Sequence, residues 1–463
     1  MLDLNNLIQD NSMSYSAYVL LHRCMADLRD GCKPIHRMIM YSMYKNKTFN
    51  LTKSANVCGK VMEFSPHGDC YQTVVNMVQK DKQHVPLIQG KGNFAQHTSR
   101  DLQPAASRYS EVKLSDMSMS MLEDLDKNMV NFVDNYDGTQ KMPECLPVKY
   151  PAILCYNNIG IGVGMSSTIC SFNMNEVNLA IIDYIKNGNK KVLVPDLPTY
   201  GFIKMDEDEF NNINNTGMGK ICMRGRCNVE KNIITITEIP YNTTREAIID
   251  KIIKLVKDGK IKSITSVKDL TDLQGVCIEI TCKKSANTQE VIEYLYKNTP
   301  LETTYSIEMR MLVDGLPKVL GVWSVIDKWL DFRRECIVNG LTYEVEKLKS
   351  RQHILEGFKK IIDVIDDVID VIKKSEDDSL IKNLMDKFCL TELQAEYIAN
   401  IKLRNLNKTY ISTKIKELDD IKKTIKQNNE IINSKKLIDE VVIKGLEETN
   451  KKFKTQRRSQ IIC

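Results

Sequence analysis

The sequence predicts a multidomain α+β protein whose three parts differ in composition. The chain has 463 residues, of which 42% are hydrophobic and 27% are charged, an ordinary balance for globular domains. Alternating strand patterns lie in the middle of the chain, whereas the last third has the periodicity of long helices. We therefore exclude disordered, collagen-like and membrane-spanning classes, and place three domains at residues 1–149, 150–318 and 319–463.

The first domain combines short helical patterns, polar turns and most of the positive charge. TKSANVCGKVME, with Thr52 as its N-cap, and YQTVVNMVQK are predicted helices on either side of the turn sequence SPHGDC. Residues 1–113 hold 14 Lys and Arg against 9 Asp and Glu, an excess equal to the +5 of the whole chain, and five of the six histidines. This pattern suits a helix-turn-helix or winged-helix unit that binds phosphate groups.

The second domain alternates strands and helices. NIITITEIPY predicts a strand, and a helix follows in which Thr243 and Glu246 have the spacing of a capping box and Gly259 marks the end. GVCIEITC predicts another strand. A strand, a helix and a second strand in this order indicate an α/β unit.

The third domain is rich in Lys, Glu and Ile. Ile411, Leu418, Ile425 and Ile432 recur every seven residues, which predicts a helix packed lengthwise on a partner. We expect a long antiparallel helical hairpin whose outgoing arm covers residues 323–372. CLTELQAEYIANIKLRNL, residues 389–406, should form a compact helical knob at the tip.

Several chemistries find no support in the sequence. The 14 cysteines are scattered without zinc spacing, which favours reduced thiols. GKGNF and GIGVG (160–164) do not meet the spacing of nucleotide-binding loops, and hydrolase and metal motifs are absent. Neither an export signal nor a membrane span is visible, so we expect a cytoplasmic protein that holds no metal ion with its own residues.

The basic region carries the side chains that phosphate-transfer chemistry needs. A tyrosine that attacks a phosphodiester needs its proton removed, the transition-state charge neutralised and the leaving oxygen protonated. Arginine and histidine side chains can meet much of that demand. On spacing alone, however, any one of the 18 tyrosines is more often a packing residue, and a histidine before glycine is more often a turn residue.

Eight sequence strings change this assessment. They are, in chain order, RDGCKPIHR, SPHGD, QGKGNF, AASRYSEVKL, VDNYDGT, GIGVGM, EIPYNTTRE and LTELQAEYI. In this order and at this spacing they resemble the DNA-cleavage subunit of type IIA topoisomerases. That family includes the A subunits of gyrase and topoisomerase IV and the medium subunit of phage topoisomerases. The resemblance runs from about Ser12 to near the end of the sequence.

The resemblance implies a set of site residues. Tyr109 of AASRY would be the nucleophile that links to a 5′ phosphate, and Arg108 would steady it. His67 and Arg23 would stabilise charge, and Ile169 would be the apolar wedge that inserts between base pairs. The residues expected to hold DNA are Lys33, His36, Arg37 and Lys53. Ser65 and Met38 depart from the pattern, because many relatives have a histidine and a second basic residue at those two positions.

The resemblance also implies a fold, partners and an activity. The three domains would be a winged-helix DNA gate, an α/β tower, and a long antiparallel coiled coil with a helical exit-gate knob. Double-stranded DNA, a second copy of the chain and an ATPase subunit resembling the B subunit of gyrase would complete a heterotetramer. The ATPase subunit would hold Mg²⁺ and ATP.

The expected reaction is a transient double-strand break through 5′-phosphotyrosine links. The chain ends soon after KKFKTQRRSQII, so a DNA-wrapping domain is not expected, and relaxation or decatenation should result. A phage enzyme is favoured over a shortened cellular topoisomerase IV, in a bacterial or phage-infected cytoplasm. The alternative is a catalytically silent DNA-binding and dimerisation protein on the same scaffold.

Overall fold

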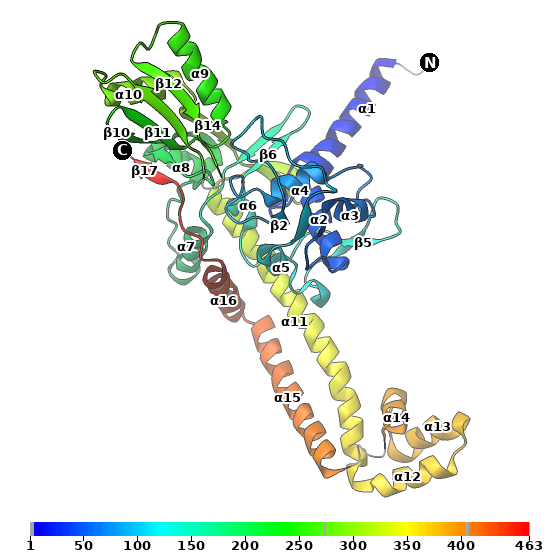
Figure 1. Ribbon diagram of the computed structural model, residues 1–463. Coiled ribbons are helices and arrows are strands. Elements are labelled where there is room, and N and C mark those ends of the chain that lie inside the picture. The colour runs from blue at the N-terminus through cyan, green and yellow to red at the C-terminus, as the bar shows by residue number, and fades with distance from the viewer. Residues whose placement is uncertain (1–3, 273–274, 403–406, 463) are drawn as a thin grey trace. The chain divides into compact units, whose positions relative to one another are not determined.

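The computed structural model describes residues 4–272, 275–402 and 407–462, and the chain divides into two compact units (Figure 1). The first unit contains residues 1–125, 130–333 and 442–463, and the second contains residues 126–129 and 334–441. Sheets and helices in the first unit and helices in the second confirm the expected mixture of α and β structure. The predicted limits at 149/150 and 318/319 stay predictions. Among the described residues, no helix has the length and hydrophobicity that crossing a bilayer requires.

The N-terminal part of the first unit packs short helices around a small antiparallel sheet with strand order β1-β3-β2. The strands are β1 (Thr52–Lys53), β2 (Ile88–Lys91) and β3 (Glu111–Leu114). The helices are α1 (Leu4–Val19), α2 (Pro34–Lys45), α3 (Ser54–Val61), α4 (Tyr71–Val78) and α5 (Asp116–Leu122). A π-helical turn, Leu20–Cys24, follows α1 directly. After α5, the strands β4 (Phe132–Asp134) and β5 (Lys141–Pro143) form a two-stranded hairpin.

The helices predicted around SPHGDC are confirmed as α3 and α4, but the expected N-cap is wrong. Thr52 pairs with Val112 in the sheet, so its backbone is extended. Helix α3 begins only at Ser54, after Lys53. The N-cap is Lys53, so the sheet register, which local sequence does not reveal, moves the helix start by one residue.

The remainder of the first unit is built on two larger sheets. One has strand order β17-β8-β9-β14-β7-β6 and the other has order β10-β11-β13-β12. The first consists of β6 (Asn158–Ile161), β7 (Ser166–Ile169), β8 (Phe202–Lys204), β9 (Met218–Arg224), β14 (Glu302–Glu308) and β17 (Gln460–Ile462). The second consists of β10 (Arg226–Glu230), β11 (Ile233–Glu238), β12 (Ile264–Asp269) and β13 (Ile278–Cys282). A short hairpin, β15 (Arg310–Val313) and β16 (Leu316–Val319), follows them.

Helices accompany these sheets. They are α6 (Ala152–Cys155), α7 (Met174–Asn187), α8 (Glu207–Thr216), α9 (Arg245–Lys257) and α10 (Thr288–Asn298). Ile248 and Ile252 of α9 and Leu295 of α10 are buried with Ile234 and Ile280 of the four-stranded sheet, which makes one apolar core. The strands predicted in NIITITEIPY and GVCIEITC are confirmed as β11 and β13.

Helix α9 is also confirmed, but its predicted capping box is wrong. Thr244, not Thr243, is the N-cap, and its hydroxyl accepts from the Ala247 backbone. The Glu246 carboxylate instead accepts from the Ser99 hydroxyl and, at 2.9 Å, from the Arg100 backbone. The Glu246 side chain is therefore engaged in a tertiary contact and does not cap its own helix.

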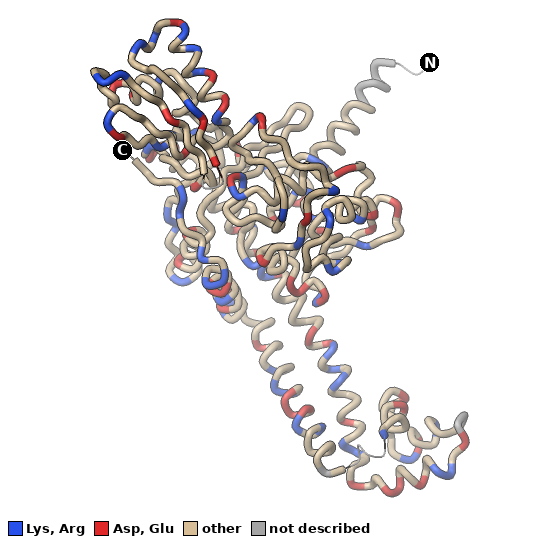
Figure 2. Tube along the Cα trace, viewed as in Figure 1, with Lys and Arg blue, Asp and Glu red and all other residues tan. Residues whose placement is uncertain are grey.

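The second unit is helical. Helix α11 (Val322–Ile361) enters it from the first unit, and the chain continues through α12 (Ile365–Lys374), α13 (Asp377–Phe388), α14 (Glu392–Ala399) and α15 (Lys408–Ile432). Helix α16 (Lys435–Phe453) returns to the first unit. Figure 1 shows α11 and α15 side by side, and Figure 2 shows Lys, Arg, Asp and Glu distributed along both.

The seven-residue repeat predicted for α15 corresponds to its buried face. Leu418, Ile421 and Ile425 pack with Val345 and Leu355 of α11. Arg351 pairs with Glu417 at 2.8 Å. The expected outgoing arm is too long, because α11 ends at Ile361 and a 3₁₀ turn separates it from α12. Part of the predicted knob, residues 403–406, lies outside the described residues.

The C-terminal segment is tied to the first unit by a buried carboxylate. Asp196, which is 0% exposed, accepts from the backbone N–H groups of Arg458 and Ser459. The Arg458 guanidinium in turn donates to the carbonyl oxygens of Lys80 and His84. Residues far apart in the sequence are therefore held in one hydrogen-bond network.

Candidate functional site

Tyr109 lies in the turn that leads into β3 and points its phenol toward solvent. Its backbone N–H donates to the Ala106 carbonyl at 2.9 Å, and 67% of the residue is exposed. The Arg108 guanidinium stands over the Tyr109 ring, 4.8 Å from its centroid. A cation beside an accessible phenol attracts the anion that a nucleophilic tyrosine becomes.

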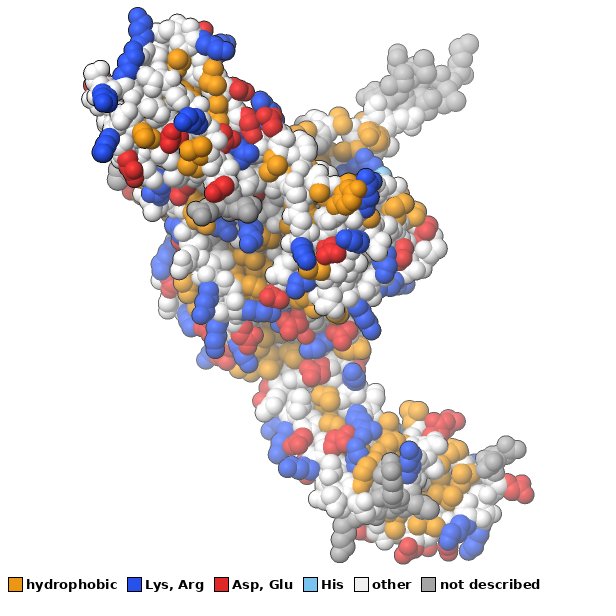
Figure 3. All heavy atoms as spheres, viewed as in Figure 1, with side chains coloured by type: hydrophobic (Ala, Val, Ile, Leu, Met, Phe, Trp, Pro, Cys, Tyr) orange, Lys and Arg blue, Asp and Glu red, His pale blue; other side chains and the backbone are white. Residues whose placement is uncertain are grey.

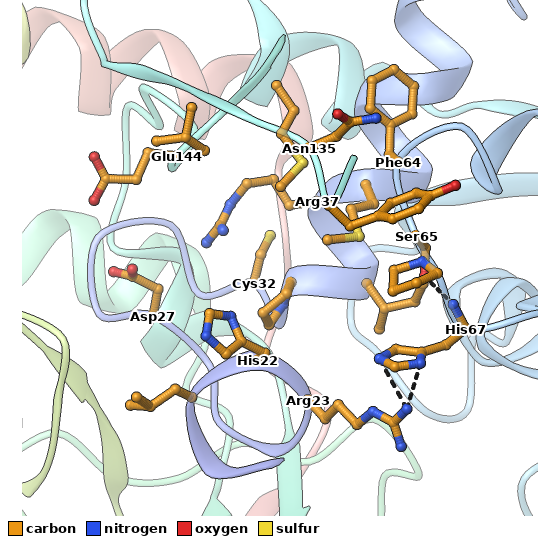
Figure 4. Close-up of a pocket in the computed structure, with 18 of the residues that line it drawn as sticks. His22, Arg23, Asp27, Cys32, Arg37, Phe64, Ser65, His67, Asn135 and Glu144 are labelled. Atoms are coloured by element: carbon orange, nitrogen blue, oxygen red, sulfur yellow. Dashed lines mark hydrogen bonds between the residues drawn. The ribbon is translucent and has the colours of Figure 1, made fainter. Parts of the chain in front are cut away.

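A second group of polar side chains, which we call the His67 cluster, consists of Tyr18, His22, Arg23 and His67. Arg23 Nη2 lies 2.5 Å from His67 Nδ1 and 2.9 Å from His67 Nε2, and the Tyr18 hydroxyl lies 3.0 Å from Nε2. The Tyr18 and His22 rings are 5.0 Å apart. Figure 4 shows Arg23 and His67 pointing toward one another. Partial burial first, and then the Arg23 charge, lower the pKa of His67, which favours the neutral imidazole.

The His67 cluster lines a cavity of about 580 Å³ in the first unit. Ser65 and Cys70, on the loop that carries His67, line it as well. Its acidic groups include Asp27 and Glu144, both of which pair with Arg29, at 2.8 and 2.9 Å. Among the described residues, no three His, Cys, Asp or Glu side chains converge as metal ligands would.

The structure brings Arg23 and His67 together, as a joint role in charge stabilisation requires. It does not bring Tyr109 and Arg108 into the same cluster. Within the described residues, no hydrogen bond or ion pair joins Tyr109 or Arg108 to Arg23 or His67. One chain therefore presents the phenol and the His67 cluster as two separate groups.

Two of the expected DNA-binding residues line another cavity, of about 190 Å³. Lys33 and His36 lie there with Lys82 and His97. Lys33 Nζ donates to the Ile159 carbonyl at 2.7 Å. Burial and the neighbouring lysines lower the pKa of both His36 and His97. This cavity thus holds two lysines whose charges disfavour protonation of its histidines.

His36 should make the fold sensitive to acid. Burial first, then Lys33, Lys82 and Arg37, lower its pKa from 6.5 to about 3. Below pH 6.5 the unfolded chain binds a proton that the folded chain does not, so stability falls as pH falls. From His36 alone we expect about 1.4 kcal/mol per pH unit over this window. Urea unfolding from pH 7 to pH 4 measures it, and His36→Gln should flatten the profile; an unchanged profile contradicts this origin.

Arg37 and Lys53 have other partners. Arg37 Nε donates to Asp30 at 2.7 Å, and the Asp30 side chain is 0% exposed. Arg37 therefore completes a buried ion pair, which leaves less of its charge for a DNA phosphate than the sequence suggested. Lys53 is half-exposed and pairs with Glu111 at 3.1 Å. Its DNA-binding role stays a prediction.

The wedge role of Ile169 stays a prediction. Ile169 is the last residue of β7 and is 0% exposed, so it would have to leave its packed position to enter a DNA base stack. In the same β6–β7 hairpin Ile161 is 81% exposed and Val163 is 55% exposed. The exposed apolar side chains of this hairpin, Ile161 and Val163, therefore lie at its tip.

Two glycines explain how the tip is presented. A Cβ on Gly160 would meet the Cys24 carbonyl oxygen at 2.3 Å, and one on Gly162 would meet Leu20 Cδ2 at 2.5 Å. The hairpin thus packs its glycine side closely against the π-helical turn. Because successive residues of a strand face opposite sides, Ile161 between these glycines faces outward.

Comparison with known proteins identifies the family of the chain. The family model for the A subunit of DNA gyrase and topoisomerase IV matches residues 23–447. The chain belongs to this family. It is 34% identical to the A subunits of DNA topoisomerase 4 from Bacillus subtilis and Staphylococcus epidermidis, and 32% identical to the DNA gyrase A subunit of Staphylococcus epidermidis. Each comparison covers 99% of this chain but 59%, 60% and 53% of those relatives, so the chain spans little more than half their length.

Two exposed residues of this gyrase and topoisomerase IV homologue were missed in the sequence. The signal for Ile161 was present, because an apolar residue between two glycines in GIGVG indicates a hairpin that packs on its glycine side. Tyr18 gave no such signal. It precedes Arg23 by five residues, and in an α-helix two such side chains point about 140° apart.

Proposed function

We propose that this chain is the DNA-cleavage and religation subunit of an ATP-dependent type IIA topoisomerase. The observation that carries the proposal is the exposed Tyr109 phenol beneath the Arg108 guanidinium, in a chain of the gyrase and topoisomerase IV family. The accessible phenol can reach a DNA backbone, which a packing tyrosine cannot. The three predicted domains would act as DNA gate, tower and coiled coil with exit gate.

The reaction is a transesterification at phosphorus. The Tyr109 oxygen loses its proton and attacks, the bond from phosphorus to the 3′ oxygen breaks, and the 3′ oxygen takes up a proton. The product is a 5′-phosphotyrosine with a free 3′ hydroxyl. Because the number of phosphoester bonds is unchanged, rejoining needs no ATP. Arg108, Arg23 and His67 would neutralise the charge that develops on the phosphate oxygens.

Partners follow from this chemistry. Cutting both strands needs two tyrosines, so the proposal includes a homodimer in which each copy attacks one strand. Figure 3 shows hydrophobic side chains on the surface of the unit that carries α12, α13 and α14, and Leu393 of α14 is 62% exposed. This surface is the proposed exit-gate contact between copies.

Mg²⁺ and ATP are assigned by the proposal to a partner that resembles the B subunit of gyrase, in a heterotetramer. In the cavity lined by the His67 cluster, Asp27 and Glu144 are both engaged by Arg29, and no three His, Cys, Asp or Glu side chains of the described residues converge as metal ligands would. Mg²⁺ at a cleavage site neutralises phosphate charge. Relaxation and decatenation, a phage-type origin and a cytoplasmic location stay predictions.

The proposal is tested by trapping the cleaved complex. The chain is mixed with end-labelled DNA, Mg²⁺, ATP and the ATPase subunit, and the reaction is stopped with denaturant. Protein attached covalently to 5′ ends supports the proposal. DNA binding and dimerisation without any adduct would instead favour a catalytically silent scaffold. Supercoiled and catenated substrates then distinguish relaxation from decatenation.

Ile161 is proposed to insert between base pairs and bend the DNA. Its 81% exposure at the hairpin tip supports this role, since an apolar side chain that unstacks a base step must be accessible. We expect Ile161→Ala to reduce DNA bending, measured by fluorescence energy transfer between the DNA ends, and to slow cleavage about tenfold, equivalent to roughly 1.4 kcal/mol.

Leu316→Ala is the matched control for Ile161→Ala. Leu316 is 60% exposed at the turn of the β15–β16 hairpin and should leave bending unchanged. Equal effects of the two substitutions, or an unbent complex in the wild type, would remove Ile161 from the mechanism.

A further inference from the structure

Tyr18 contacts the proposed catalytic histidine from a separate part of the chain. Its hydroxyl lies 3.0 Å from His67 Nε2, across 49 residues of sequence. Its ring also meets the edge of the His67 ring, with centroids 6.1 Å apart. The imidazole is thus in contact with Tyr18 through both a polar and an apolar surface.

The π-helical turn explains why Tyr18 and Arg23 reach the same imidazole. In a regular α-helix, side chains five residues apart point about 140° from each other. A π-helical turn closes i→i+5 and brings such a pair toward one face. The turn Leu20–Cys24 lies between Tyr18 and the end of the helix, and it includes Arg23. A local backbone irregularity therefore assembles the cluster.

The hydrogen-bonding roles favour a tyrosine at this position. An arginine N–H can only donate, and the shorter contact of Arg23 Nη2 is with His67 Nδ1, at 2.5 Å, so Nδ1 is the nitrogen that accepts. The other nitrogen of a neutral imidazole carries a proton. That nitrogen is Nε2, and the Tyr18 hydroxyl oxygen, 3.0 Å away, can accept from its N–H. Phenylalanine would keep the ring contact and lose only this hydrogen bond.

We propose that Tyr18 is a positioning residue, which holds the His67 imidazole in the orientation that strand cleavage uses. This inference rests on the proposed function, because it concerns the same site. Tyr18 acts through His67 and not on DNA. Tyr18 is 40% exposed and does not belong to the buried core, so the fold does not depend on its hydroxyl.

The test combines Tyr18→Phe with His67→Ala. In the wild-type background, Tyr18→Phe should lower the single-turnover cleavage rate about three- to tenfold, the effect expected for one lost hydrogen bond. In the His67→Ala background the same substitution should have no effect, because its target is gone. DNA affinity and thermal unfolding should not change. Tyr15→Phe is the matched control, since Tyr15 lies on the same helix and is 61% exposed.

NMR spectroscopy of the histidine side chains tests the contact between Tyr18 and His67 without any measurement of activity. In protein with labelled histidines, the NMR signal that disappears in His67→Ala belongs to His67. Its chemical shift and titration midpoint should change in Tyr18→Phe and stay constant in Tyr15→Phe. Unchanged titration and cleavage in Tyr18→Phe, or an equal loss of cleavage with and without His67, would overturn the positioning role. A wild type that forms no adduct would instead overturn the proposed function, and the role of Tyr18 in cleavage with it.

Discussion

Replacing Tyr109 by phenylalanine is expected to abolish the covalent protein–DNA adduct, with a loss of at least about a thousandfold in cleavage. The substitution removes the attacking oxygen and leaves the ring, so the Arg108 contact at 4.8 Å can persist. Because the phenol points to solvent, the fold should be unaffected. Denaturant-trapped cleavage of end-labelled DNA with Mg²⁺ and the ATPase subunit measures the effect.

The control for this experiment is Tyr200→Phe. Tyr200 is 51% exposed, and its ring contacts Arg458, a contact that phenylalanine retains. Cleavage by Tyr200→Phe at the wild-type rate would show that the loss is specific to Tyr109. Adducts formed by Tyr109→Phe at the wild-type rate would mean that another residue is the nucleophile. DNA binding by Tyr109→Phe should be close to that of the wild type, because phosphate contacts by other residues dominate affinity.

The sequence predicted the regular elements better than their ends. The repeat in Leu418 and Ile425 marked a helix with a buried face because a seven-residue period is a property of the local chain. The ends of α3 and α9 were misplaced because Thr52 pairs with a strand and Glu246 bonds a distant loop. Tertiary partners, which no local pattern specifies, decided both ends.

The sequence proposed residues for the candidate site but could not predict their geometry. Family strings placed Arg23 and His67 in one site, but the contact between them spans 44 residues and depends on a π-helical turn. The wedge role was assigned to Ile169 because a sequence motif does not reveal how exposed a side chain is. Burial separates Ile169, at 0% exposed, from Ile161, at 81%. Strand alternation between two glycines was the sequence signal for the exposure of Ile161.

Replacing Asp30 by alanine is expected to lower the free energy of unfolding by about 3–5 kcal/mol, the usual cost of breaking a buried ion pair from one side. The Asp30 carboxylate accepts from Arg37 Nε at 2.7 Å and from the backbone N–H groups of Cys32 and Leu146, each at 2.9 Å. Arg37 Nη2 also donates to it, at 3.1 Å, so its removal leaves four N–H groups without their acceptor, two of them on a charged guanidinium. Urea unfolding at pH 7 measures the change.

An exposed ion pair in the same unit provides the comparison. Asp134 and Lys141 are 3.6 Å apart with side chains 62% and 71% exposed, and Asp134→Ala should cost under about 1 kcal/mol. Burial opposes the Arg37 charge, but Asp30 raises the pKa of Arg37 above its ordinary value, so the pair persists across the accessible pH range. Similar losses from the two substitutions would contradict a structural role for Asp30. A large loss from Asp30→Ala alone would mean that the residues of RDGCKPIHR stabilise their own loop. Arg37 would then contribute to DNA binding indirectly, by holding that loop in its folded conformation.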